Sequence, residues 1–152
     1  ILSESDCKLE CKALPIFIPE LVNCVCIKVY DGDTIRVRGA MEQDAKRRCY
    51  NFNIRISGID TAELRSKCEY EKRFARYTRD YLKAEILGRS VLVDVLRRDK
   101  YGRLLAIVRR SRDGFNVAMD LQKKGLAVTY DGGKKIERDY ESLVLLHCPK
   151  VL

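Results

Sequence analysis

Acidic and arginine side chains recur at the ends of the predicted strands, where together they could act on a phosphodiester. Two or more carboxylates with a threonine carbonyl suit a hard cation such as calcium, which takes oxygen ligands in irregular geometry. A further carboxylate can activate a water, and two arginines can clamp a phosphate through forked, permanently charged donors. The chemistry indicated is metal-assisted phosphodiester hydrolysis. The set consists of Asp31, Asp33, Arg55, Asp60, Thr61, Glu63 and Arg103.

Each of these residues alone has an ordinary structural explanation. Asp31-Gly32-Asp33 is a common turn sequence, and Asp60-Thr61 could cap a helix with Glu63 as a favourable acid in its first turn. Arg103 could simply lie on the surface. Four acids and two arginines at strand ends together make these explanations less persuasive, but composition alone does not decide between them.

Hydrophobic periodicity predicts a mainly β fold with helices. Three strands, a helix, two strands and a further helix follow one another, which is the order of a five-stranded Greek-key barrel of the OB type with about three helices. Barrels of this type often bind nucleic acids across one face. The predicted strands begin at Leu21 and then cover Thr34–Arg38, Tyr50–Ile56, Ser90–Leu96 and Arg103–Arg109, with a charged loop over 39–48. The predicted helices cover Ala62–Leu87, Val117–Lys124 and Lys135–Leu146.

The predicted helix over Ala62–Leu87 carries aromatic residues at three- and four-residue steps. Tyr70, Phe74, Tyr77 and Tyr81 would lie on one stripe of this helix. We interpret them as one buried stripe of core residues and not as a stacking platform for bases.

The chain length of 152 residues fits one domain with a sizeable core. Residues 1–20 are predicted to form an N-terminal extension, because Pro15 and Pro19 exclude a regular helix there, and residues 21–152 form the barrel domain. No apolar run approaches the roughly 20 residues that span a bilayer, so no membrane segment is expected in this chain. The compartment remains open.

The net charge of +8 and a pI near 9.2 favour a polyanionic partner. Nucleic acid, an acidic membrane face and an acidic protein all qualify, and improved solubility explains the charge equally well.

Seven cysteines, an odd number, exclude a fully paired disulfide framework within one chain. We expect small buried hydrophobes and free thiols, and a monomer. A structural zinc site is a weaker alternative, because the only histidine, His147, lies beside Cys148 and no cysteine pair has the usual two-residue gap.

Four segments of the sequence resemble the staphylococcal nuclease (thermonuclease) family. They are Val29-Tyr30-Asp31-Gly32-Asp33-Thr34, Arg55-Ile56-Ser57-Gly58-Ile59-Asp60-Thr61-Ala62-Glu63, Asp99-Lys100-Tyr101-Gly102-Arg103 and Gly125-Leu126-Ala127. Their order and approximate spacing also fit, and the likeness runs from Val22 to Lys135. Tyr130-Asp131-Gly132-Gly133-Lys134 is similar to the bacterial-type branch.

The resemblance implies a calcium-dependent endonuclease on an OB barrel. It would hydrolyse DNA and RNA with little sequence specificity, leaving 3′-phosphate and 5′-hydroxyl ends. By the same resemblance, Asp33 and Asp60 bind calcium through carboxylates and Thr61 through its backbone carbonyl, with Asp31 supporting them from behind. Glu63 activates the attacking water, and Arg55 and Arg103 hold the phosphate. Lys100 and Tyr101 contact a neighbouring phosphate, and Tyr130 lies near a base or sugar.

Two departures from the family pattern concern the segment around Glu63. Ala62 stands where the family commonly has proline, and the predicted helix starts so early that the loop carrying Glu63 is shortened. An inactive nucleic-acid-binding OB module is the alternative function. We place it second because inactive copies would be expected to lose acids or arginines that this sequence retains.

Overall fold

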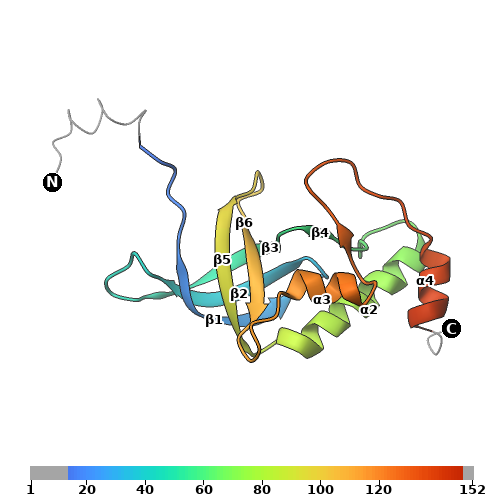
Figure 1. Cartoon of the computed structure of the whole chain (residues 1–152), viewed down its shortest axis with the longest axis horizontal. Helices are drawn as coiled ribbons and strands as arrows, with labels where there is room; N and C mark the ends of the chain where they lie inside the picture. Colours follow the sequence, from blue (N-terminus) through green and yellow to red (C-terminus); the bar gives the residue numbers. More distant parts are fainter. Residues whose placement is uncertain (1–13, 149–152) are drawn as a thin grey trace.

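Five strands close a barrel in the computed structural model, which describes residues 14–148. The strand order around the barrel is β1-β2-β3-β6-β5, and β5 pairs again with β1 (Figure 1). The β3–β6 pair is parallel and the other pairs are antiparallel. The predicted OB-type barrel with helices is therefore confirmed. The barrel strands are β1 (Leu21–Val29), β2 (Thr34–Met41), β3 (Cys49–Ile56), β5 (Ser90–Arg98) and β6 (Leu104–Arg110).

Alternation along the strands separates the core from the outer face of the barrel. In β2, Ile35 and Val37 are fully buried, whereas Arg36 and Arg38 between and beyond them lie outside. Successive side chains of a strand point to opposite faces, so the polar residues of β2 share the outer face with those of its neighbours. The barrel thus buries one set of side chains and presents the other to solvent.

Within residues 14–148, three helices accompany the barrel, and Figure 1 shows them gathered beside one end of it. They are α2 (Glu69–Ile86), α3 (Val117–Lys123) and α4 (Tyr140–His147). Two further strands, β4 (Ile59–Asp60) and β7 (Val128–Thr129), form a separate antiparallel pair that the sequence did not predict.

The helix predicted from Ala62 is wrong at its start, because α2 begins at Glu69. Thr61 and Ala62 are buried, and the Thr61 hydroxyl donates to Asp33 at 3.2 Å, which holds the chain out of a helical path. The favourable helix composition of this segment is overridden by tertiary contacts. Glu63 therefore lies on a loop over 61–68 and not directly before a helix. The shortening of this loop relative to the family pattern stays a prediction.

The predicted aromatic stripe of this helix is only partly buried. Phe74 is fully buried, but Tyr70 and Tyr77 are exposed and Tyr81 is half-buried. Small and aliphatic residues complete the buried face instead, namely Ala75, Thr78, Leu82 and Ile86.

Two other predicted boundaries are corrected. The last helix begins at Tyr140 instead of Lys135, because the side chain of Asp139 caps it by accepting from the Ser142 N–H. The loop predicted over 39–48 is shorter, since β2 continues to Met41 and β3 begins at Cys49. Gly39 lies within β2. A Cβ at this position would lie 2.7 Å from the Cys24 sulfur, so glycine allows β1 and β2 to approach each other closely here.

Five of the seven cysteines lie within residues 14–148, and each of these five is a free thiol. Cys24, Cys26 and Cys148 are buried, and burial raises the pKa of the Cys24 and Cys26 thiols to about 11. Cys7 and Cys11 lie outside the described residues. Within the described part of the chain, no helix has the length and apolar character needed to cross a membrane.

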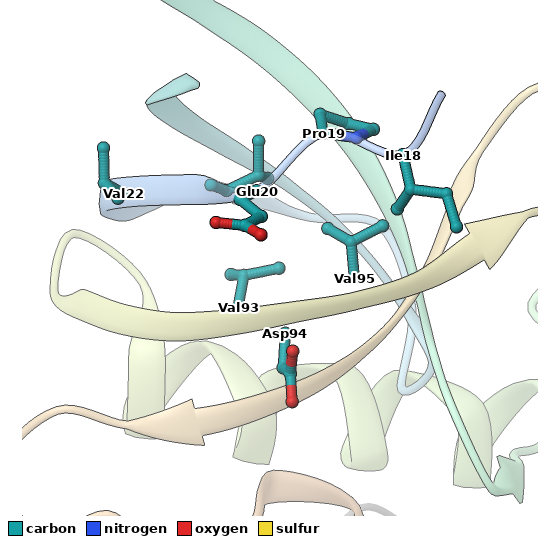
Figure 2. Close-up of a pocket in the computed structure, with 8 residues that line it drawn as sticks. Ile18, Pro19, Glu20, Val22, Val93, Asp94 and Val95 are labelled. Atoms are coloured by element: carbon teal, nitrogen blue, oxygen red, sulfur yellow. The ribbon is translucent and has the colours of Figure 1, made fainter. Parts of the chain in front are cut away.

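A half-open pocket of about 390 Å³ lies where β1 and β5 diverge (Figure 2). β1 pairs with β5 only around Cys24 and Val25, so residues 18–22 stand apart from residues 93–95. The lining is mainly aliphatic, and none of the predicted site residues contributes to it. The boundary between an extension and the barrel domain at residues 20 and 21 stays a prediction, although β1 begins at Leu21.

Candidate active site

The turn between β1 and β2 fixes two of the predicted acids. The Asp33 N–H donates to the Asp31 carboxylate at 3.1 Å, and the Tyr30 N–H donates to the Thr34 carbonyl at 3.0 Å. Gly32 between the acids is tightly enclosed, because a Cβ there would lie 2.6 Å from the Thr78 methyl and 2.8 Å from the Thr61 methyl. The Asp-Gly-Asp sequence is thus required by close packing as well as by the turn.

Asp33 is the most enclosed acid of the site, with 9% of its surface exposed. Its carboxylate accepts from the Thr34 hydroxyl at 3.0 Å and from the Thr61 hydroxyl at 3.2 Å. The guanidinium of Arg55 lies 3.5 Å away. The contacts with Arg55 and Thr61 join the β1–β2 turn to a segment more than 20 residues further along the chain.

Arg55, at the end of β3, is held by backbone carbonyls. Its two terminal nitrogens donate to the carbonyls of Ile56 and Ile59, each at 2.8 Å. The same guanidinium lies between Asp33 at 3.5 Å and Asp60 at 3.9 Å. One cation therefore faces both acids that the family resemblance assigns to the metal.

The short β4–β7 pair positions Asp60 and Thr61. Asp60 pairs with Val128, and the Tyr130 N–H continues the ladder by donating to the Gly58 carbonyl at 2.9 Å. Thr61 follows directly and is buried. The C-terminal segment of the fold therefore determines where the second acid stands.

Burial and like charge act on the carboxylates of this cluster. Burial, followed by the neighbouring charge of Asp33, raises the pKa of Asp31. Burial also raises the pKa of Asp60, with Lys135 opposing the shift and Asp33 adding to it. Closely spaced carboxylates with raised pKa values are stabilised in their ionised form by a cation.

Glu63 differs from the other acids in being exposed. Its backbone N–H donates to the Glu71 carboxylate at 3.0 Å, which ties the loop to the first turn of α2. Its own carboxylate accepts a hydrogen bond from the ammonium of Lys135, and that ammonium also lies 3.6 Å from Asp60. Lys135 thereby links Glu63 to Asp60.

Arg103 is anchored on the side of the site formed by β2 and the β5–β6 turn. Its Nε donates to Asp99 at 2.7 Å and its Nη1 donates to the Thr34 hydroxyl at 3.3 Å. Burial alone would raise the pKa of Asp99, but hydrogen bonds from Arg103 and the Tyr101 backbone outweigh it and lower the pKa. Thr34 contacts Asp33 as well, so Arg103 is connected to the acids through one hydroxyl.

Lys100 and Tyr101 extend from the same turn. Tyr101 is 71% exposed, and the Lys100 ammonium lies 5.2 Å from the centre of its ring. The Arg103 guanidinium lies 5.5 Å from the same ring. Both groups are accessible to a ligand beside Arg103.

The structure brings together Asp31, Asp33, Arg55, Asp60, Thr61 and Arg103, and it connects Glu63 through Lys135. Tyr130 is half-buried beside the β4–β7 pair, and within residues 14–148 its side chain forms no hydrogen bond to these residues. Sequence reasoning missed Lys135 and Thr34. The Gly-rich basic segment over 130–135 was a signal for Lys135, but nothing in that pattern placed it beside an acid.

The donor set of the cluster fits a hard cation. The carboxylates of Asp33 and Asp60 both lie near the Arg55 guanidinium, at 3.5 and 3.9 Å, and the family resemblance adds the backbone carbonyl of Thr61 to this donor set. Oxygen ligands of this kind, completed by water, are those that calcium takes. Within residues 14–148, no group of three or more His, Cys, Asp or Glu side chains is arranged to hold a metal ion by itself, and this applies to the acids of the cluster as well as to the cysteines.

Comparison with known proteins adds independent findings. The profile of the family described as "Staphylococcal nuclease homologue" matches residues 53–147. A "Probable endonuclease LCL3" of Schizophyllum commune is 34% identical over 88 residues, covering 53% of this chain and 30% of that protein. An "Uncharacterized endonuclease" of Escherichia coli O157:H7 is 31% identical over 105 residues, covering 69% of this chain and 59% of that protein.

A third similar protein is a "Probable endonuclease lcl3" of Neosartorya fischeri, 35% identical over 103 residues. The match covers 59% of this chain and 35% of that protein. The chain thus spans between 30% and 59% of the length of these three relatives.

Proposed function

The chain belongs to the staphylococcal nuclease family, and on that premise we propose that it is a calcium-dependent nuclease acting on DNA and RNA. The proposed reaction is hydrolysis of phosphodiester bonds with little sequence specificity, leaving 3′-phosphate and 5′-hydroxyl ends. The names of the relatives, endonucleases in each case, support the general class of activity.

One observation carries the proposal, namely the convergence of two acids and two arginines on the turn between β1 and β2. Arg55 lies 3.5 Å from Asp33 and 3.9 Å from Asp60, and Arg103 reaches the same turn through Thr34. Such a site suits a phosphate together with a metal ion, because the carboxylates attract the metal ion and the guanidinium groups attract the phosphate.

In this proposal the residues of the chain divide the work. Arg55 and Arg103 donate hydrogen bonds to the non-bridging oxygens of the scissile phosphate and stabilise the negative charge that grows there. Glu63 accepts a proton from the attacking water, which requires that Lys135 release its carboxylate. Lys100 and Tyr101 hold an adjacent phosphate, and Tyr130 contacts a base or sugar.

Asp33, Asp60 and the Thr61 carbonyl would hold calcium, with Asp31 steadying the turn behind them. A divalent cation in that position supplies charge neutralisation at the phosphate. The buried hydrogen bonds from Thr34 and Thr61 to Asp33 keep its carboxylate oriented toward Arg55.

The direct test is cleavage of single-stranded DNA, double-stranded DNA and RNA with calcium, with magnesium and with a calcium chelator. Cleavage that requires calcium and leaves 3′-phosphate ends supports the proposal. Binding without cleavage under every condition contradicts it and makes the inactive nucleic-acid-binding module the better description.

A further inference from the structure

A second pair of cations surrounds an aromatic ring on the outer face of the barrel. The Lys28 ammonium lies 4.6 Å from the centre of the Tyr30 ring, and the Arg36 guanidinium lies 5.6 Å from it. Lys28 is exposed, whereas Tyr30 and Arg36 are half-buried. Neither cation belongs to the set of residues predicted for the active site.

These two cations are held without a carboxylate partner. Arg36 donates through Nε to the Asn53 side chain at 3.0 Å, which leaves both terminal nitrogens of its guanidinium for other acceptors. Within residues 14–148, neither Lys28 nor Arg36 forms an ion pair, in contrast to Arg103, which is paired with Asp99 at 2.7 Å. Their charges are therefore available to an external anion.

Strand register places this pair directly beside the candidate active site. Lys28 pairs with Arg36 across β1 and β2, and Arg36 pairs with Asn53 across β2 and β3. Two residues along β2, Thr34 pairs with Arg55 on the same outer face. A step of two residues along a strand is roughly 7 Å, so the two rows adjoin.

The Tyr101 group shows the same arrangement of two cations around one ring. Tyr101 also stands between a lysine and an arginine, with Lys100 at 5.2 Å and Arg103 at 5.5 Å from its ring. In each case the ring restrains two flexible cations at one place, which lowers the entropy lost when they bind an anion. The Tyr101 group lies at the β5–β6 turn and the Tyr30 group at the β1–β2 turn.

We propose that Lys28, Tyr30 and Arg36 form a second phosphate-binding subsite, which holds the backbone of a single-stranded nucleic acid next to the scissile phosphate. The subsite rests on the proposed nuclease function for its ligand. Its chemistry is that of an ammonium and a forked guanidinium, with Asn53 fixing the orientation of the guanidinium.

Binding at different salt concentrations tests the subsite without cleavage. A fluorescent thymidine oligomer of about 16 nucleotides, the upper end of the site size of an OB barrel, is titrated with the whole chain in the presence of a chelator. The slope of log affinity against log salt should fall in magnitude by about 1.4 in Lys28→Ala/Arg36→Ala, because each single-strand phosphate contact contributes about 0.7.

Two matched variants control for charge and folding. Arg36→Lys keeps the charge and should retain most of the salt slope. Arg109→Ala removes an exposed arginine from the outer face of β6 and should leave the slope unchanged. An unchanged slope in the double variant overturns the subsite, and so does an equal decrease in Arg109→Ala.

The nuclease proposal and the subsite proposal fail in different ways. If the wild-type chain does not cleave the oligomer in calcium, but the double variant still loses about 1.4 of the salt slope, the nuclease is contradicted and the subsite is supported. A chain that cleaves in calcium, but whose double variant keeps the wild-type slope, contradicts only the subsite.

Discussion

Asp33 and Glu63 belong to one candidate site but are held in different ways. The Asp33 side chain is 12% exposed and accepts hydrogen bonds from two threonine hydroxyls, whereas the Glu63 side chain is 57% exposed and accepts a hydrogen bond from a lysine. In the proposed function, this difference divides the site into a rigid part, which would bind the cation and the phosphate, and an adjustable part, which would accept the proton. Rigid donors need no reorganisation during reaction, but a base that must accept and release a proton benefits from access to water.

The largest effect on the rigid part is expected from Arg103→Ala. Turnover should fall about 1,000-fold, because one donor to the developing charge is worth about two to three orders of magnitude. The loss in substrate affinity should be much smaller, since the donors act mainly as charge develops. Separate measurement of kcat and of oligomer binding in chelator checks this, and a loss confined to affinity would assign Arg103 to simple phosphate binding.

Gly32→Ala should disturb the packing beneath the acids. Its Cβ would meet the methyl groups of Thr78 and Thr61 at 2.6 and 2.8 Å, and such overpacking costs about 1 to 3 kcal/mol of unfolding free energy. Urea denaturation measures the change, and Thr78→Ser in the same background should recover part of it. Gly133→Ala is the control, because its Cβ would meet only the Asp131 carboxylate at 3.1 Å.

Asp99→Asn should loosen Arg103 and lower turnover about tenfold, the effect expected from a weakened charge-assisted hydrogen bond. The pKa of Asp99 is lower in the folded than in the unfolded chain. Its contribution to the free energy of unfolding is therefore complete above the unfolded carboxyl pKa and is lost as the pH falls through the lowered pKa. Asp94→Asn, an exposed change on β5, should leave turnover unaltered. Equal losses in both variants would argue against a specific anchor.

The smallest effect concerns the contact between the two parts of the site. Lys135→Met should raise calcium affinity roughly two- to fivefold, because an exposed cation beside Asp60 competes with the metal and exposed ion pairs contribute under about 1 kcal/mol. Calorimetric titration measures the affinity, with Lys134→Met as the control. A decrease in affinity would instead mean that Lys135 supports the calcium-binding conformation.

The barrel strands were predictable because the alternation of apolar and polar residues in the sequence matches the alternation of buried and exposed side chains in the structure. Ile35 and Val37 alternate with arginines in β2, and this local pattern survives in the barrel. The β4–β7 pair was not predictable, since two residues per strand give no periodicity and Asp60 meets Val128 only after the chain has folded. The position of Asp60 therefore depends on a contact that the sequence does not display.

Errors around Glu63 have a related cause. Residues after Thr61 have good helix propensity, but burial of Thr61 and Ala62 and the hydrogen bond to Asp33 prevent the helix from starting there. Similarly, the basic loop over 130–135 indicated charge but not that Lys135 would contact Glu63. The turn that carries Asp31 and Asp33 thus followed from motif and strand order, whereas the positions of Asp60 and Glu63 depend on long-range contacts with Val128 and Lys135.

Calcium binding and turnover measured together in Glu63→Gln test this division most directly. The account predicts that calorimetry finds wild-type calcium affinity, because Asp33, Asp60 and Thr61 remain, while turnover falls by at least about 100-fold through loss of the base. Loss of calcium affinity along with turnover would contradict the account by making Glu63 a metal ligand. Unchanged turnover would contradict it by removing Glu63 from the chemistry.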